Sequence, residues 1–342
     1  MRSFPALSGL VGCAVLVAGV LPSTGLSAPA AAASFASIER SRAVLTPGTI
    51  FVANASAGFE GGLGTGNGSV TAYRPTATGD EGPVLVLTKG ILDPTSLIFD
   101  SSDDLWVGNN SNSDNVVEYS KAELIAASPA PTVTISESGA GAMGVAFDPS
   151  GDLWITKTNF TAVELTKAQL TESGSPVPEV TITNTDQCSV VFDSLGDMWE
   201  GSFDSVVREF TPTQLAESGS PAPIVTVSSD SLSMPCQPTL DSAGDLWAAN
   251  YLGDSVVEFT KAQLAKSGSP TPQVTITSDY LAYPGDAAFD PGGDLWVPSA
   301  QDEAVVEFTK AQLTRSGTPT PARAVYGSST GLSWPWALAV EP

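Results

Sequence analysis

The sequence predicts an all-β fold: a six-bladed β-propeller with four strands per blade, closed into a ring by the C-terminal strand. Two observations carry this prediction. A unit of about 48 residues occurs five times, and its tryptophans are spaced 48, 45, 48 and 49 residues apart. The 32 glycines and 26 prolines indicate many turns. A unit of this size holds four short strands, as one propeller blade does.

Each unit begins with two strands joined by an aspartate–glycine turn, as in FDPSGDLW. Aspartate and glycine supply the chemistry of a tight turn, so this block is predicted to be a hairpin. The hairpin blocks occupy residues 99–106, 147–154, 192–199, 240–247 and 289–296.

The third strand is predicted from the block that reads VVEF in its commonest form, because β-branched and aromatic residues favour strands. The TKAQL block that follows is predicted to be one helical turn with threonine as its N-cap and Ser-Gly at its exit. The Pro-x-Pro-x-Val-Thr-Ile block is predicted to be a fourth strand at the edge of the blade, where a missing N–H is tolerated.

The sixth blade is split between the two ends of the domain. Residues 48–54, 68–73 and 83–87 resemble strands two to four of a blade that lacks its first strand. Residues 335–342 align with residues 284–291 and are predicted to supply that strand. The predicted single domain therefore covers residues 48–342. Its blade 1 comprises residues 48–88 plus 335–342, and blades 2–6 occupy residues 95–334, approximately.

The N-terminus has the pattern of a cleaved signal peptide over residues 1–33, followed by a tail at 34–47. Arg2 precedes a short apolar run at 7–21, and an alanine-rich tract follows. A lipobox ending at Cys13 is an alternative. We expect a secreted or extracytoplasmic protein without membrane insertion, since no later stretch is long and apolar enough to span a membrane.

Composition excludes several classes of function. The chain has 14 Lys and Arg against 37 Asp and Glu, a net charge of −23, which argues against a nucleic-acid partner. It has no histidine, which excludes Ser-His-Asp and Cys-His catalysis and histidine metal ligands.

Two cysteines remain after the signal peptide, and they occupy equivalent places in neighbouring repeats. Cys188 lies four residues before Phe192, and Cys236 lies four before Leu240. Both should therefore stand at the start of an innermost strand, where the ring is narrowest. This placement predicts a Cys188–Cys236 disulfide, which an oxidising compartment would preserve.

Residues that recur in every blade are predicted to be structural. The five repeated tryptophans should pack between blades. The paired aspartates, such as Asp148 and Asp152, should stabilise their turns, and the third-strand glutamates, such as Glu164 and Glu258, should share a structural role.

Positions that differ between blades are better candidates for ligand binding. Three residues after the second-strand aromatic position, each blade carries a polar residue, and together these are predicted to form a polar ring on one face: Asn54, Asn109, Lys157, Ser202, Asn250 and Ser299. Tyr251, Tyr283, Asp286 and Trp336 are expected in the neighbouring loops. A water-filled central channel without a ligand is the alternative interpretation.

The block VAFDPSGDLWIT (145–156) resembles NHL repeats and the wider group of six-bladed propellers that includes gluconolactonase-type and streptogramin-lyase-like proteins. The resemblance covers nearly all of the mature chain and implies the propeller fold. It also implies a divalent-metal enzyme as one alternative, because such lactonases hold a cation with Glu, Asn and Asp. The histidine of streptogramin lyases has no counterpart in this sequence.

These observations favour a secreted, non-catalytic binding propeller with no cofactor and its ligand face at the central channel. The expected ligand is a small molecule, a glycan, a peptide or a protein, and the expected state is a monomer. One alternative is a lactonase- or lyase-like enzyme using calcium or magnesium, with Asp204 and Asp286 as the candidate metal ligands. Another is a structural protein of the cell envelope.

Overall fold

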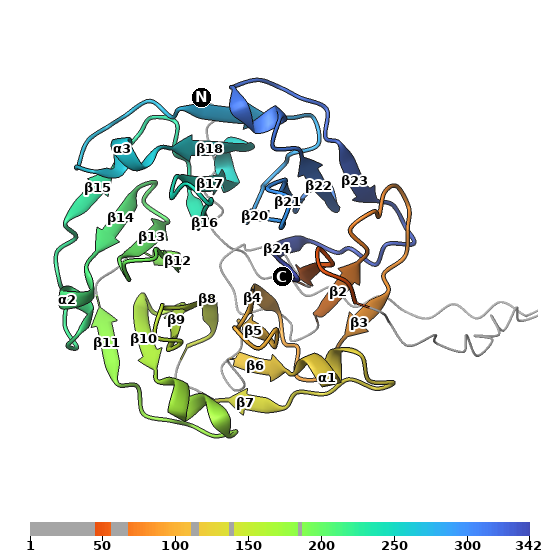
Figure 1. Ribbon diagram of the computed structural model, residues 1–342, viewed down its shortest axis with the longest axis horizontal. Helices are drawn as coiled ribbons and strands as arrows, with labels where there is room; N and C mark the ends of the chain where they lie inside the picture. Colours follow the sequence, from red (N-terminus) through yellow and green to blue (C-terminus); the bar gives the residue numbers. More distant parts are fainter. Residues whose placement is uncertain (1–44, 56–67, 111–115, 137–139, 184–186) are drawn as a thin grey trace, which may run out of the picture. The chain divides into compact units, whose positions relative to one another are not determined.

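The computed structural model describes residues 45–55, 68–110, 116–136, 140–183 and 187–342. In this part of the chain, the strands form six four-stranded antiparallel sheets arranged in a ring (Figure 1). The predicted six-bladed propeller is confirmed. The predicted signal peptide and all but the last residues of the predicted tail lie outside the described residues.

The first three blades have their strands in the following order, from the innermost strand outward. Blade 1 consists of β24 (Pro335–Val340), β1 (Ile50–Asn54), β2 (Ser69–Tyr73) and β3 (Leu85–Leu87). Blade 2 consists of β4 (Pro94–Phe99), β5 (Leu105–Asn109), β6 (Val116–Tyr119) and β7 (Val133–Ile135). Blade 3 consists of β8 (Ala142–Phe147), β9 (Leu153–Lys157), β10 (Thr161–Leu165) and β11 (Val180–Thr183).

The other three blades follow the same plan. Blade 4 consists of β12 (Gln187–Phe192), β13 (Met198–Ser202), β14 (Val207–Phe210) and β15 (Val225–Val227). Blade 5 consists of β16 (Pro235–Leu240), β17 (Leu246–Asn250), β18 (Ser255–Phe259) and β19 (Val274–Thr277). Blade 6 consists of β20 (Ala288–Phe289), β21 (Leu295–Ser299), β22 (Ala304–Phe308) and β23 (Arg323–Tyr326).

The two ends of the domain close the ring in blade 1. Strand β24 is antiparallel to β1, with Ile50 opposite Val340 and Val52 opposite Leu338. The predicted pairing of the C-terminal strand with the first strand of the domain is therefore confirmed. Closure gives β1 a partner on the edge that would otherwise be left unpaired.

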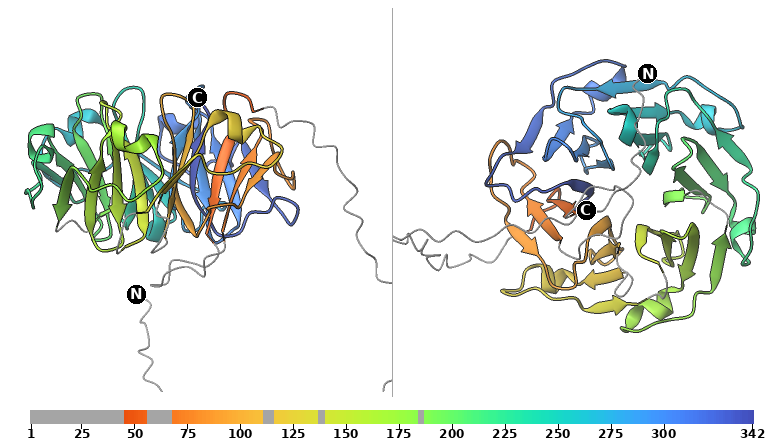
Figure 2. Two further views of the ribbon diagram at one scale, coloured as in Figure 1. Left: turned by 90° about the horizontal axis from the view of Figure 1, so that it is seen from below. Right: turned by 180° about the vertical axis from the view of Figure 1, so that it is seen from behind.

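The strands run between two faces of the ring (Figure 2, left). We call the face that carries the Asp-x-x-Gly-Asp turns the hairpin face. The second strands leave it and end at the opposite face, which we call the ring face because the predicted polar ring lies there.

The hairpin turns form as predicted. In blade 3 the Oδ1 atom of Asp148 accepts hydrogen bonds from the backbone N–H groups of Ser150 (2.8 Å) and Asp152 (3.0 Å). Gly151 has a φ of +84°, a left-handed conformation that glycine adopts without a Cβ clash. The same aspartate contacts recur at Asp100, Asp193, Asp241 and Asp290.

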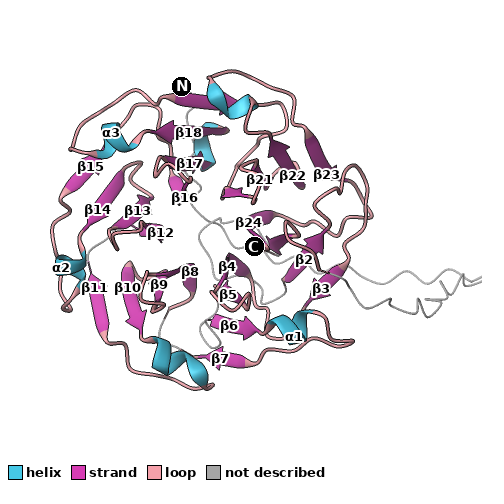
Figure 3. Ribbon diagram, viewed as in Figure 1, coloured by secondary structure: helices cyan, strands magenta, loops and turns pink. Residues whose placement is uncertain are grey.

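Short helical turns lie at the periphery of the ring, after the third strands (Figure 3). They are α1 (Lys121–Leu124), η1 (Lys167–Thr171), α2 (Pro212–Leu215), α3 (Lys261–Leu264) and η3 (Gln312–Thr314), where η marks a 3₁₀ helix. The predicted threonine cap is present at α3, where Thr260 and Gln263 form a reciprocal capping box. None of the helices in the described residues is long and apolar enough to cross a membrane.

After η1, α2, α3 and η3, a Ser-Gly segment covers the outer edge of the preceding blade. Ser267 Oγ accepts a hydrogen bond from the N–H of Thr226 on β15 (3.0 Å), and Gly268 N–H donates to the Thr226 carbonyl oxygen (3.0 Å). Equivalent bridges join Gly174, Gly219 and Gly317 to the preceding fourth strands. The fourth strands β7, β11, β15 and β19 thereby gain partners on an edge that would otherwise be open.

The repeated tryptophans pack between blades, as predicted. Trp106 of blade 2 meets Phe147 of blade 3 in an edge-to-face contact, with ring centroids 5.8 Å apart, and Trp247 meets Phe289 at the same distance. All five tryptophans are at least 95 % buried. They hold neighbouring blades together and do not form a sugar-stacking surface.

Candidate functional site

All six residues of the predicted polar ring lie at the ring-face ends of the second strands, and all are at least 96 % buried. Four of them make the same contact. In each, the side chain accepts a hydrogen bond from a backbone N–H in the loop before the first strand of the blade. This N–H belongs to the residue two positions before the proline that leads into that strand. These pairs are Asn54 with Ser333, Asn109 with Leu92, Asn250 with Ser233, and Ser299 with Ala282.

Both the oxygen and the nitrogen of the Asn250 side-chain amide form hydrogen bonds within the protein. Its Oδ1 accepts from the Ser233 N–H (3.1 Å), and its Nδ2 donates to the Ser231 carbonyl oxygen (2.7 Å) and to Ser255 Oγ (3.1 Å). These bonds tie down the loop that leads into β16. The polar ring therefore positions the ring-face loops, and its amides are engaged within the protein.

The remaining two ring positions also have buried side chains. Lys157 ends β9 and is 96 % buried. Ser202 ends β13, and its hydroxyl donates to the Val206 carbonyl oxygen (2.7 Å) and also contacts Asp204.

Asp204, one of the two candidate metal ligands, already has a cationic partner. Arg208 on β14 forms an ion pair with Asp204 and a second one with Glu200 (2.9 Å from Nη1 to Oε1). Glu200 is fully buried, so the arginine lies between a buried and an exposed carboxylate. The charge that a metal ion would supply at Asp204 comes instead from a guanidinium group.

Asp286, the other candidate, lies inside the ring. Its Oδ1 accepts from the Ala287 N–H (2.7 Å), and its Oδ2 accepts from the N–H of Leu338 on β24 (3.0 Å). Burial raises the pKa of Asp286 to about 7, against the two backbone hydrogen bonds. It lines a central cavity of about 440 Å³ together with residues such as Ser96, Ser189 and Gln237.

An apolar cluster occupies the ring-face end of the innermost strands. It includes Met143, Met234 and Trp336, together with the disulfide between Cys188 and Cys236, whose Cα atoms are 4.9 Å apart. The predicted disulfide is confirmed. It joins the innermost strands of blades 4 and 5 within this cluster.

Four aromatic rings at the ring face extend this cluster toward the surface. Tyr251 stacks on Tyr283 (centroids 5.0 Å apart) and contacts Trp336 (5.0 Å), and Tyr283 contacts Trp334 (6.4 Å). Tyr251 and Trp336 are buried, whereas Tyr283 and Trp334 are partly exposed. Three of these residues are among the sequence-predicted candidates. Trp334 is not, although its position directly before Pro335 was a signal that could have identified it.

The two partly exposed aromatics are held in a left-handed backbone conformation. Tyr283 has a φ of +55° and Trp334 a φ of +48°. Each directly precedes the proline at the end of its loop. The N–H of Tyr283 donates to Oδ1 of Asp254 in the neighbouring blade (2.9 Å). Non-glycine residues in this conformation cost about 1–3 kcal/mol each and persist where the surroundings impose them.

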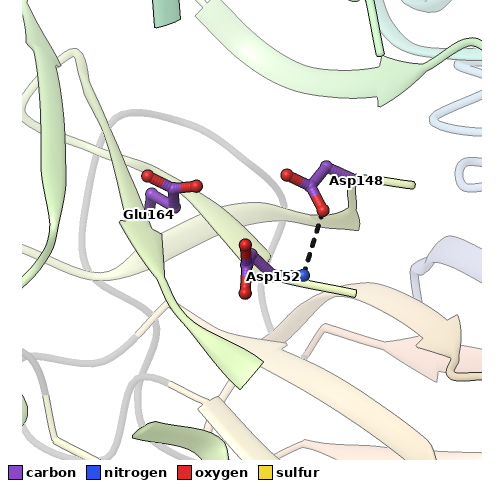
Figure 4. Close-up of side chains that lie close together, drawn as sticks. All are labelled: Asp148, Asp152 and Glu164. Atoms are coloured by element: carbon purple, nitrogen blue, oxygen red, sulfur yellow. Dashed lines mark hydrogen bonds between the residues drawn. The ribbon is translucent and has the colours of Figure 1, made fainter. Parts of the chain in front are cut away.

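The hairpin face carries a different feature, three groups of converging carboxylates. Each group contains the two aspartates of a hairpin turn and the glutamate of the third strand, and we call it a carboxylate triad. In each triad, one oxygen from every residue lies within 4.8 Å of the other two. The triads are Asp148, Asp152 and Glu164 in blade 3 (Figure 4), Asp241, Asp245 and Glu258 in blade 5, and Asp290, Asp294 and Glu307 in blade 6.

Strand register brings the glutamate to the turn. In blade 5, Glu258 on β18 lies opposite Trp247 on β17, two residues after Asp245. Burial, together with Asp245 and Asp241, raises the pKa of Glu258 to about 7. Burial and the two aspartates of its own turn likewise raise the pKa of Glu164 to about 7.

Blade 6 differs from the other two triads because it contains its own cation. Arg323 on β23 lies opposite Glu307 and donates from Nη1 to its carboxylate (2.6 Å to Oε2). In blades 3 and 5 the equivalent position is occupied by Val180 and Val274.

Comparison with known proteins shows the fold and no family. No family model matches the sequence, and no curated protein matches it. A protein of unknown function from Bacteroides caccae has a TM-score of 0.60 and 10 % identity over 86 % of this chain and 98 % of its own. A chain of a nidogen/laminin complex has a TM-score of 0.58 and 12 % identity over 86 % and 99 %.

A streptogramin B lyase gives a TM-score of 0.48 and 14 % identity over 79 % of this chain and 83 % of its own. At identities of 10 to 12 %, the two structures with TM-scores of 0.58 and 0.60 show a likeness of fold alone, and the fold of this chain is a six-bladed β-propeller.

Proposed function

We propose that this protein is a secreted, non-catalytic binding propeller whose ligand contacts the ring face beside the central channel. One observation carries the proposal: Tyr283 and Trp334 are held partly exposed, in a left-handed backbone conformation, over a buried aromatic cluster. A rigid aromatic surface of this kind offers contact area at little cost in conformational entropy. The disulfide agrees with an oxidising, extracytoplasmic location.

The charge around this surface suggests the chemistry of the ligand. Asp254, Asp302 and Glu303 are exposed in the ring-face loops of blades 5 and 6. They would attract a cationic group and repel anions. We therefore expect a ligand with a flat apolar part and a positive charge, or a sugar presented with a cationic substituent.

The indole N–H of Trp334 supports a polar contact at the same place. Among the described residues this buried donor has no hydrogen-bond partner. Buried donors are normally satisfied, so an ordered water is expected beside it.

Two double variants test the placement of the ligand. Arrays of amino sugars and of basic aromatic peptides identify a probe, and its affinity is then measured by intrinsic tryptophan fluorescence and by calorimetry. We expect Tyr283→Ala with Trp334→Ala to weaken binding at least tenfold, about 1.4 kcal/mol. The control, Lys261→Ala with Gln263→Ala on the hairpin face, should leave the affinity unchanged.

Equal losses from both pairs, or a loss only from the hairpin-face pair, would reject the placement. If the protein instead turned the probe over, and Asp204→Asn or Asp286→Asn abolished that turnover, the metal-enzyme alternative would replace the binding function.

A further inference from the structure

We propose that the carboxylate triad of blade 5, made of Asp241, Asp245 and Glu258, is a calcium site. Calcium takes oxygen ligands at about 2.3–2.6 Å, so two oxygens bound to one ion lie up to about 5 Å apart. The three carboxylates of the triad offer oxygens within 4.8 Å of one another. The spacing thus fits a shared ion.

The second observation is the state of Glu258. The residue is 91 % buried, and its carboxylate has no hydrogen-bond or ion-pair partner within the described part of the chain. It points toward two aspartates instead of a donor. Glu258 lines a cavity, so its carboxylate keeps some access to solvent. Most of the residue is buried, and a bound cation would compensate for the hydration and donors that the carboxylate lacks.

Lys261, which lies beside the hairpin turn of blade 5, does not take that role. Lys261 covers the turn glycine, since a Cβ built on Gly244 would lie 3.9 Å from its Nζ. Its backbone N–H donates to Asp245 Oδ1 (2.7 Å). No ion pair between Lys261 and the triad is present among the described residues.

Blade 6 provides an internal comparison. There, the triad glutamate Glu307 is paired with Arg323, and Arg323 occupies the position that Val274 holds in blade 5. In blade 6 the protein itself therefore supplies a cation, the guanidinium group of Arg323, beside the triad glutamate. In blade 5, where the position is occupied by Val274, the proposed cation would come from solution.

The chemistry of the triad favours calcium over magnesium. The Oδ1 atom of Asp241 accepts two turn N–H groups, from Ala243 (2.8 Å) and Asp245 (3.0 Å), which fixes the direction of that carboxylate. Calcium tolerates such irregular sets of ligands, whereas magnesium demands a nearly octahedral arrangement. The site faces a cavity of about 510 Å³ between blades 5 and 6, with room for the waters that complete coordination.

Calcium titration by calorimetry, on the whole protein freed of cations, tests the proposal. We expect saturable binding with a Kd of about 0.1–1 mM, the range of extracellular calcium modules. Glu258→Gln keeps the shape of the side chain and should either remove one site per molecule or weaken it about tenfold or more. The charge-matched control is Glu217→Gln, at an exposed position after α2, which should not change the titration.

Val274→Arg gives a second, independent variant. It recreates in blade 5 the pairing found in blade 6, so it should remove one calcium site while the cation-free protein keeps or gains thermal stability. Absence of saturable binding by the wild type would overturn the proposal. So would titrations of Glu258→Gln and Val274→Arg that match the wild type in both stoichiometry and affinity.

Discussion

On the hairpin face, blades 3 to 6 place a glycine at the left-handed turn position, with φ between +81° and +85°. On the ring face, most left-handed positions are occupied by residues with side chains, although Gly90, Gly327 and Gly331 in two of the lead-in loops also have a positive φ. Four of these directly precede a proline at the start of a first strand, and they are Asp93, Met234, Tyr283 and Trp334. The turns of one face are thus built at low conformational cost, and those of the other hold side chains in a strained conformation.

This difference indicates that hairpin-face residues and ring-face residues of the repeat have different roles. Hairpin-face residues recur because blades 2 to 6 share the same hairpin turn and the same tryptophan position. Ring-face loops differ in sequence between blades, although the buried polar ring holds four of them through hydrogen bonds to their backbone. A surface that is free to vary, and yet is held rigidly, is suited to binding a ligand.

The largest expected effect comes from removing the scaffold that both faces share. Deletion of residues 335–342 removes β24, exposes β1 and opens the ring. We expect the cooperative unfolding transition of the wild type to be lost in scanning calorimetry. Pro342 is exposed, so its deletion alone should change the free energy of unfolding by less than about 0.5 kcal/mol. A long deletion that melts like the wild type would show that closure is not needed.

The next effect concerns the disulfide below the ring-face aromatics. Cys188→Ala with Cys236→Ala removes a crosslink between residues 48 positions apart, which the chain-entropy model values at about 4 kcal/mol. Urea unfolding measures this loss, and mass spectrometry after alkylation counts free thiols in the wild type. Two thiols that alkylate in the native, unreduced protein would contradict the bond.

A hairpin-face aspartate should matter for stability and not for binding. Asp100 accepts from the N–H groups of Ser102 (2.7 Å) and Asp104 (3.1 Å) and from the indole of Trp106 (3.1 Å). Asp100→Ala should cost about 2–3 kcal/mol in urea unfolding, because three donors lose a charged acceptor. The control, Asp279→Ala in an exposed ring-face loop, should change stability by less than about 0.5 kcal/mol. Similar losses of unfolding free energy in Asp100→Ala and Asp279→Ala would contradict the proposed difference between the two faces.

The smallest effect tests the conformational comparison itself. Glu303 is exposed on the ring face at a φ of +48°, and Gly293 occupies a hairpin turn at +82°. Glu303→Gly should stabilise the protein by about 0.5–1 kcal/mol, since relief of the strain exceeds the entropy cost of glycine. Gly293→Ala should destabilise it by about 1–2 kcal/mol. Chemical unfolding measures the change in unfolding free energy of both variants. A destabilised Glu303→Gly variant and a stabilised Gly293→Ala variant would refute the strain argument.

The architecture was predictable because the repeat encodes it. The spacing of Trp106 and its equivalents indicated five blades. Residues 48–87, together with the alignment of residues 335–342 with residues 284–291, indicated the sixth blade and the closure. Equivalent positions in adjacent repeats also predicted the disulfide. All of these depend on residues whose place in a blade is fixed by local sequence.

The surroundings of the candidate side chains were not predictable in the same way. The sequence places Asn250 at the end of a strand but does not show that the loop before β16 folds over its amide. Likewise, the pairing of Arg323 with Glu307 depends on the register of β22 and β23. Contacts that depend on loop conformation or strand register can be identified only from coordinates. Contacts that recur in each repeat can be predicted from the sequence of the repeat.

Hydrogen–deuterium exchange with and without the probe found on the arrays tests the central claim most directly. If the ring face binds, amide exchange should slow in the segments 250–254, 280–284 and 332–336. The hairpin turn at 241–245 and the caps at 260–264 should exchange at the same rate in both states. Protection confined to those turns and caps, with no change at the ring-face loops, would contradict the account.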